Sequence, residues 1–356
     1  MGLISSILVL SFLVFFHELG HFLAAKLFGV RVEAFSIGFG KTRILKKQIG
    51  ETEYSLRPIP LGGFVQLKGQ SDFDPTIRDT SSDSLYGIQA YQRLIILGAG
   101  SFFNLLLAFL LFVAIGLMGK NELAPIVGKV EANMPAAIAG LKSGDEILSV
   151  NGQGVRTWEA LSQRIAKSKG ALEIGFLRDS KEYQVVLNPK FGESKNLFGE
   201  SISRPLIGIV SSGEMRIVSY GFLDSLGYAW GQTLESSQLI LQSIEKLISG
   251  VVPLSEVGGV VSIVSITKKA SELGIVTLFA FTALISVNLG ILNLLPIPAL
   301  DGGHILFTLY EMLTKRIPTQ NTFYRLSMAG WIVLLGLMGL GLYNDVLRII
   351  HGTMPF

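Results

Sequence analysis

Apolar residues gather in four long runs that are separated by mixed or polar sequence. The runs cover residues 3–28, 94–118, 275–295 and 326–342. Each approaches the roughly 20 residues that an α-helix needs to cross the hydrocarbon of a bilayer. The pattern therefore predicts a polytopic α-helical membrane protein with four transmembrane helices, the first within 1–28, the second within 93–119, the third within 275–303 and the fourth within 326–356.

The segment between the first two runs, residues 29–92, has a different pattern. Residues 30–35 alternate between apolar and polar positions, and residues 36–40 and 61–67 combine glycines with aromatic and β-branched residues. Such sequences are typical of short strands and hairpins, although a disordered loop is the alternative. We expect a membrane-associated β segment here, followed by a flexible cytoplasmic loop over the polar residues 70–85.

Residues 120–192 have the pattern of a small water-soluble domain. In order, they predict a strand (126–130), a short helix (135–141), a strand (146–150), an amphipathic helix (158–166) and two more strands (172–187). Asn151-Gly152 is a typical tight-turn pair after the second strand. We expect one compact domain between the second and third transmembrane helices.

Residues 193–274 contain a long amphipathic stretch. Its apolar positions recur at helical spacing: Leu223, Leu226, Trp230, Leu234, Leu241, Ile244 and Ile248. Glu235, Gln238, Gln242 and Glu245 argue against a further transmembrane helix. Two interpretations stay open, a helix lying at the outer membrane surface and a helix that buries its apolar stripe within the protein.

Composition supports the membrane assignment and excludes several chemistries. The chain is 49% hydrophobic and 16% charged, whereas soluble domains average about 25% charged residues. Because it has no cysteine, it has no disulfide, no thiolate zinc site and no cysteine nucleophile. No basic run with interleaved aromatic residues is present, so we expect no nucleic-acid partner.

Lysine and arginine are concentrated next to particular helix ends. Ten of them lie between Lys26 and Arg93, and Lys315, Arg316 and Arg325 lie in the segment 304–325 after the third helix. The positive-inside rule places both segments in the cytoplasm. The N-terminus, the long segment 120–274 and the C-terminus are then expected outside.

The strongest chemical motif lies within the first apolar run. His17-Glu18-Leu19-Gly20-His21 has the pattern His-Glu-x-x-His. On a helix, positions i and i+4 share one face, so both imidazoles can bind one zinc ion while Glu18 takes a proton from a zinc-bound water. A chance match is the alternative, but ionisable groups inside an apolar helix are costly unless they have a function.

A catalytic zinc usually has three protein ligands and one open position. The broken, Pro- and Gly-rich stretch 293–304 offers Asp301 at the cytoplasmic end of the third helix, with His304 as the rival ligand. Taken alone, Asp301 before Gly302-Gly303 would suit a helix cap. Together with the histidine pair, Asp301 is the favoured third ligand.

These motifs resemble the site-2 protease family of intramembrane zinc metalloproteases, and most closely its bacterial RseP-type members with a PDZ domain. The resemblance rests on Phe16 to Phe22, on Pro60 to Val65, on the PDZ-like string 139–152, and on 286–290 together with Asp301-Gly302-Gly303-His304. It implies Zn²⁺ bound by His17, His21 and Asp301, Glu18 as catalytic acid/base, and Asn288 and Asn293 as substrate-binding residues.

The resemblance also implies the biology. Members of the family cleave peptide bonds within transmembrane segments of single-pass proteins, such as an anti-sigma factor or remnant signal peptides, in the bacterial inner membrane. The zinc site is expected toward the cytoplasmic side, and an extracytoplasmic PDZ domain would bind peptide C-termini. Residues 30–69 would hold the substrate as an extended strand.

The chain departs from the family pattern at three points. It has room for one PDZ domain rather than two, and Ser101 and Gly259 stand where a proline is usual. Two other functions remain as alternatives. A catalytically inactive membrane scaffold presenting a PDZ domain is disfavoured by the intact motifs, and a transporter is disfavoured by the lack of polar residues in the second and fourth helices.

Overall fold

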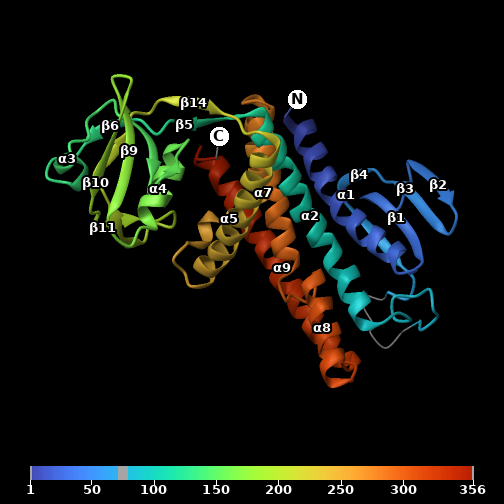
Figure 1. Ribbon diagram of the computed structural model, residues 1–356. Helices are drawn as coiled ribbons and strands as arrows, with labels where there is room; N and C mark the ends of the chain where they lie inside the picture. Colours follow the sequence, from blue (N-terminus) through green and yellow to red (C-terminus); the bar gives the residue numbers. More distant parts are fainter. Residues whose placement is uncertain (1, 71–78, 355–356) are drawn as a thin grey trace. The chain divides into compact units, whose positions relative to one another are not determined.

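The computed structural model describes residues 2–70 and 79–354 (Figure 1). Residues 71–78 of the expected flexible loop therefore lie outside the described residues. The chain forms two compact units. One comprises Met1–Ala114 and Leu226–Phe356, and the other comprises Ile115–Ser225.

Within the described residues, four helices are long and apolar enough to cross a membrane, as the four apolar runs predict. They are α1 (Gly2–Leu27), α2 (Ala90–Met118), α7 (Ile275–Asn293) and α9 (Gln320–Ile350). Helix α9 is longer than the apolar run 326–342 because its polar ends are helical too. It begins where the Thr319 hydroxyl accepts a hydrogen bond from the Thr322 amide.

The helix boundaries around Asp301 differ from those that the sequence predicts. Helix α7 ends at Asn293, an irregular stretch follows, and a further helix, α8 (Asp301–Thr314), begins at the aspartate itself. The expected loop 304–325 is thus helical over its first half. Pro296 and Pro298 cannot continue α7 because proline lacks the amide donor and clashes with the preceding turn. The sequence after them again has helix-forming residues.

The expected β segment forms a four-stranded sheet in the order β2-β3-β1-β4. The strands are β1 (Val32–Phe39), β2 (Leu45–Ile49), β3 (Thr52–Leu56) and β4 (Ile59–Leu67). β1 pairs in parallel with β3 and antiparallel with β4. A buried apolar cluster that includes Ala25, Val32, Leu67 and Ile96 joins α1, this sheet and the start of α2.

Small residues let the membrane helices approach closely. A Cβ atom at Gly20 on α1 would collide with the carbonyl oxygen of Ala99 on α2, so only glycine fits there. On the other side of α2, the Ser286 hydroxyl of α7 donates to the carbonyl oxygen of Asn104 at 2.7 Å. These contacts fix α1, α2 and α7 against one another (Figure 1).

Two further helices belong to the same unit for all or most of their length. The amphipathic stretch forms α5 (Phe222–Ile248), as predicted, and α6 (Val260–Glu272) follows a short 3₁₀ turn, Leu254–Glu256. The Ser6 hydroxyl of α1 donates to the Val264 carbonyl of α6. Trp230 and Leu234 of α5 line an open groove with Phe102 and Phe109 of α2. Leu241 and Ile248, further along the apolar stripe of α5, are exposed as well.

The second unit has one four-stranded sheet, β10-β9-β7-β8, and three strand pairs. Its elements are β5 (Lys120–Leu123), β6 (Val127–Val130), α3 (Pro135–Ile138), β7 (Glu146–Val150), β8 (Gln153–Gly154), α4 (Trp158–Ala166), β9 (Leu172–Arg178), β10 (Lys181–Leu187), β11 (Lys190–Lys195), β12 (Ser201–Leu206), β13 (Ile209–Ser211) and β14 (Met215–Val218). Asn151 and Gly152 have φ values of 51° and 72° in the predicted tight turn.

This unit is larger than the expected 120–192. Strand β13 pairs with β6 and β14 pairs with β5, so residues beyond 192 complete the fold. Strands β13 and β14 have only three and four residues, which is too short for a clear alternation in the sequence. Ile147, Leu161 and Ile174 are fully or almost fully buried in its core.

Candidate metal centre

Helix α1 presents two histidines toward the interior of the helix group. His17 and His21 lie one turn apart, and their Nε2 atoms are 3.2 Å from each other. The spacing of four residues on a helix produces this convergence, as the motif predicts. The Nδ1 atom of His21 lies 2.8 Å from the backbone carbonyl oxygen of Ile96 on α2, which holds the ring in place.

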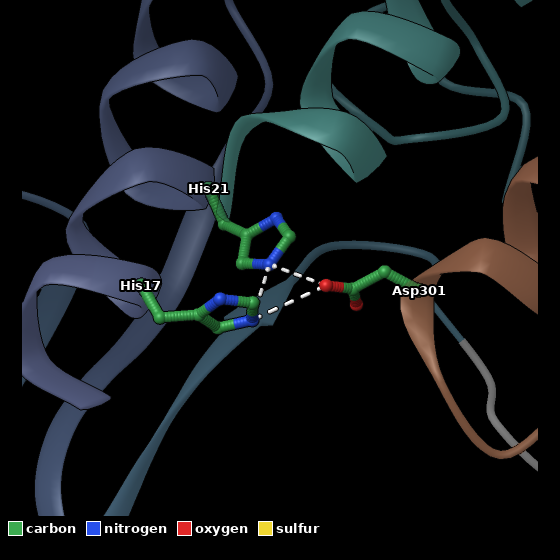
Figure 2. Close-up of side chains that lie close together, drawn as sticks. All are labelled: His17, His21 and Asp301. Atoms are coloured by element: carbon green, nitrogen blue, oxygen red, sulfur yellow. Dashed lines mark hydrogen bonds and ion pairs between the residues drawn. The ribbon is translucent and has the colours of Figure 1, made fainter. Parts of the chain in front are cut away.

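Asp301 completes a three-residue cluster (Figure 2). Its Oδ2 atom lies 3.2 Å from His17 Nε2 and 3.3 Å from His21 Nε2. Because Asp301 opens α8 directly after the proline-broken stretch, its short side chain reaches across to α1. Within residues 2–70 and 79–354, this is the one group of three histidine or acidic residues placed to hold a metal ion.

The cluster fits a zinc ion in its geometry and its donors. A tetrahedral site with bonds of about 2.0–2.1 Å separates its ligand atoms by about 3.3 Å, and the observed separations are 3.2–3.3 Å. Two imidazole nitrogens and one carboxylate oxygen also form a known catalytic zinc donor set with a position left open. Asp301 Oδ2 is buried without an ordinary hydrogen-bond partner, as expected of a metal ligand.

The cluster opens into a cavity of about 280 Å³. Of the other residues expected in the site, Glu18 and Asn293 line this cavity. Its lining includes His17, Glu18, His21, Phe64, Val65, Asn293, Asp301, His304 and Trp331. The Asn293 Nδ2 atom lies 3.5 Å from His17 Nε2, at the edge of the metal cluster. His304 faces the same cavity but is not in the cluster.

Asn288 is not among the described residues that line this cavity. It precedes Asn293 by five residues on α7, which corresponds to a rotation of about 140° around a helix. The structure therefore brings together His17, Glu18, His21, Asp301 and Asn293, and leaves Asn288 apart.

Phe64 and Val65 of β4 belong to the segment 30–69 that the family resemblance assigns to substrate binding, and they line the cavity. Trp331 of α9 lines the same cavity and was not predicted from the sequence. The Gly62-Gly63 pair beside Phe64 was a signal for close approach, since a Cβ at Gly63 would lie 2.7 Å from the Ser36 carbonyl oxygen and 3.5 Å from Glu18 Cγ. Trp331 has no comparable signal in a helix rich in large apolar residues.

A catalytic zinc donor set held by apolar, membrane-length helices is characteristic of one class of enzyme, the membrane metalloproteases. Comparison with known proteins gives the family. The sequence profile of peptidase family M50 matches residues 5–337. The chain therefore belongs to peptidase family M50, and it is a multi-pass membrane zinc metalloprotease of the site-2 protease type.

Similar proteins agree along the whole length of the chain. A Campylobacter jejuni protein provisionally named a zinc metalloprotease is 45% identical over 347 residues, which cover 98% of this chain and 94% of that protein. A Helicobacter pylori protein with the same provisional name is 38% identical over 354 residues, covering 98% and 99% of the two chains. A Rickettsia conorii relative is 34% identical over 359 residues, covering 97% and 98%.

Proposed function

We propose that this protease cleaves peptide bonds within the transmembrane segments of single-pass membrane proteins, such as an anti-sigma factor or remnant signal peptides. The observation that carries the proposal is the convergence of His17, His21 and Asp301 within 3.3 Å on apolar helices, with Glu18 in the same cavity. A site in this setting is reached most directly by a substrate that is itself in the membrane.

The roles of the residues follow from their chemistry. His17, His21 and Asp301 would hold the zinc ion, which, when bound, supplies Lewis acidity toward water and the scissile carbonyl. Glu18 would accept the proton of the attacking water and deliver it to the leaving amine. Asn293, whose amide nitrogen lies near the cluster, would donate a hydrogen bond to the carbonyl oxygen as negative charge develops on it.

A helical substrate must be unwound before water can attack, because its own hydrogen bonds protect the peptide group. Strand β4 offers a place for the unwound segment. It is an edge strand that, among the described strands, pairs only with β1, and its Phe64 and Val65 line the catalytic cavity. We infer that the substrate adds to this edge as an extended strand beside Glu18.

The second unit would act as a PDZ domain that selects substrates. Helix α4 and the segment from β12 to β13 enclose a groove of about 190 Å³. Its lining combines the apolar side chains of Trp158, Leu161, Ile165, Leu206 and Ile209 with the polar Glu131, Ser162 and Arg204. Such a groove suits an extended peptide with an apolar C-terminal residue, which a first cleavage outside the membrane would create.

The proposed orientation in the bacterial inner membrane follows the distribution of lysine and arginine. The sheet β1–β4 and the segment between α8 and α9 would face the cytoplasm, and the second unit would lie outside. The metal cluster lies after the midpoint of α1 and beyond the end of α7, which suits a site toward the cytoplasmic side.

Substitution of the proposed general base tests the function. We expect Glu18→Gln to lower proteolysis by about 100-fold or more, since general acid–base catalysis contributes about 10²–10⁴-fold, while zinc stays bound. Membrane-fraction proteomics of cells carrying Glu18→Gln should then reveal accumulating single-pass proteins. Glu272→Gln, at an exposed position of α6, is the matched control.

Cleavage of an accumulated protein by the purified wild-type enzyme completes the test. If Glu18→Gln and Glu272→Gln cells accumulate the same proteins, and the wild type cleaves none of them, the inactive-scaffold interpretation replaces the proposed one.

A further inference from the structure

One face of α2 contacts both histidines of the cluster. Ile96, Gly100 and Asn104 are spaced by four residues and so lie in one row along the helix. The Ile96 carbonyl meets His21 Nδ1 at 2.8 Å, and Asn104 Nδ2 lies 3.2 Å from His17 Nδ1. Between them, a Cβ at Gly100 would collide with His21 Nε2 and His17 Cε1.

The contact at His21 fixes the tautomer of the neutral ring, which is the form that binds a metal ion. A backbone carbonyl can only accept a hydrogen bond, so His21 Nδ1 must carry the hydrogen. Its Nε2, which faces Asp301, then presents a lone pair. His21 is thus in the tautomer that a zinc ligand requires.

The contact at His17 is incompatible with zinc binding if Asn104 presents its amide nitrogen to the ring. An N–H₂ donor facing Nδ1 would require that nitrogen to accept, which puts the His17 hydrogen on Nε2. That hydrogen would point into the space between His21 Nε2 and Asp301 Oδ2, where the metal would bind. The oxygen and nitrogen of an asparagine amide are told apart only by their hydrogen-bond partners.

Reversing the Asn104 amide removes the conflict. The side chain is fully buried and its Oδ1 atom has no partner. With Oδ1 in the position facing His17, it accepts from Nδ1–H and leaves Nε2 free for the metal. The number of unpartnered amide atoms stays the same, so the gain lies entirely in the His17 tautomer.

Asn104 is well held for such a role. Its carbonyl oxygen accepts from Ser286 of α7 at 2.7 Å, and a Cβ at Gly290 of the same helix would lie 3.4 Å from Asn104 Cβ. We propose that Asn104 is a positioning residue whose Oδ1 accepts the Nδ1–H of His17, so that α2 fixes both histidines with their Nε2 lone pairs toward the zinc ion.

This inference rests on the proposed ligand set, and zinc affinity tests it without reference to activity. The zinc affinities of four purified full-length proteins are compared by competition with a zinc chelator. They are wild type, Asn104→Leu, Asn104→Asp and the control Asn121→Leu. Leucine removes the acceptor at similar volume, whereas aspartate keeps it. Asn121 is exposed on β5 and serves as the matched asparagine-to-leucine control.

We expect Asn104→Leu to lower zinc affinity by about 10–100-fold, the usual effect of losing such an outer partner. Asn104→Asp and Asn121→Leu should stay within about threefold of wild type. Wild-type affinity in Asn104→Leu would overturn the inference. Equal losses in Asn104→Leu and Asn104→Asp would also overturn it, because packing alone would then explain both.

His17→Ala separates this failure from a failure of the proposed ligand set. If His17→Ala binds zinc as tightly as wild type, or if wild type binds none, the ligand assignment is wrong and the role of Asn104 falls with it. If His17→Ala loses zinc and Asn104→Leu does not, only the role of Asn104 is wrong.

Discussion

Large aliphatic side chains are buried in the core of the second unit but exposed on the outer surface of α9. Ile147, Leu161 and Ile174 are at most 1% exposed in the second unit, whereas Leu335 and Leu342 on α9 are 58% and 55% exposed. Water drives apolar side chains inward in the first region, and lipid accepts them in the second. Polar residues therefore mark the interior of the membrane helices.

Helix α9 illustrates this inversion at its buried positions. Asp345 is fully buried and accepts hydrogen bonds from the backbone amides of Gly259, Val261 and Ser262 at the start of α6. A polar group inside apolar surroundings is tolerated because it is fully partnered. His17, His21 and Asp301 belong to the same category, with the proposed zinc ion as their partner.

The largest expected difference between the second unit and the start of α9 is the side of the membrane from which a reagent can reach each of them. The natural chain has no cysteine, so single cysteines can be introduced without background. We expect Glu182→Cys in the second unit to react with an impermeant thiol reagent added to intact spheroplasts. Asn321→Cys at the start of α9 should react only after the membrane is opened.

The opposite labelling pattern would invert the proposed orientation. Labelling of both sites from outside would contradict the assignment of α9 as a span that starts in the cytoplasm.

Truncation of an apolar side chain should have very different effects in the two regions. We expect Leu161→Ala to destabilise the second unit by about 2–5 kcal/mol, because it leaves a cavity in a packed core. Leu335→Ala on the lipid-facing side of α9 should change stability by about 0.5 kcal/mol or less. Hydrogen exchange of the full protein in detergent measures both, through the amides of β9 and α9 respectively. Similar destabilisation in the two variants would show that Leu335 packs against protein.

A smaller effect is expected from filling the groove of the second unit. Ser162 lines the groove on α4, and Ser162→Arg would place a long charged side chain in it. We expect discrimination between trimmed and untrimmed forms of one substrate to fall severalfold, with the intrinsic cleavage rate unchanged, since the catalytic cavity belongs to the other unit. Glu182→Arg, exposed on β10, is the control. Undiminished discrimination in Ser162→Arg would argue that the groove binds no substrate.

The sequence predicted the elements whose pattern is local. The four apolar runs, the strands of residues 32–67 and the turn at Asn151-Gly152 appear where expected, because length, alternation and turn chemistry are determined by neighbouring residues. The convergence of His17 and His21 was predictable for the same reason, since helical geometry alone brings positions i and i+4 together.

Features that depend on distant partners were predicted less well. The helix α8 was missed because Gly302-Gly303 resembles a loop when the packing of the helix against its neighbours is unknown. The extent of the second unit depends on the pairing of β13 with β6 and of β14 with β5, whose paired residues lie 79 to 98 positions apart in the sequence. The position of Asn288 outside the cavity depends on the rotation of α7, which a uniformly apolar sequence does not reveal.

The choice between Asp301 and His304 depended on the structure. Sequence reasoning favoured the aspartate but left the histidine as a rival, because both follow the proline-broken stretch. With α8 beginning at residue 301, His304 lies about 4.5 Å further along the helix axis, and it faces the cavity without joining the cluster.

Zinc content of the ligand variants tests the central claim most directly. Metal analysis of purified full-length proteins should give one zinc ion per chain for wild type and for His304→Ala, and close to none for Asp301→Ala. This result would establish that the two histidines of α1 and the aspartate of α8 form the metal site. Zinc retained in Asp301→Ala but lost in His304→Ala would contradict the account.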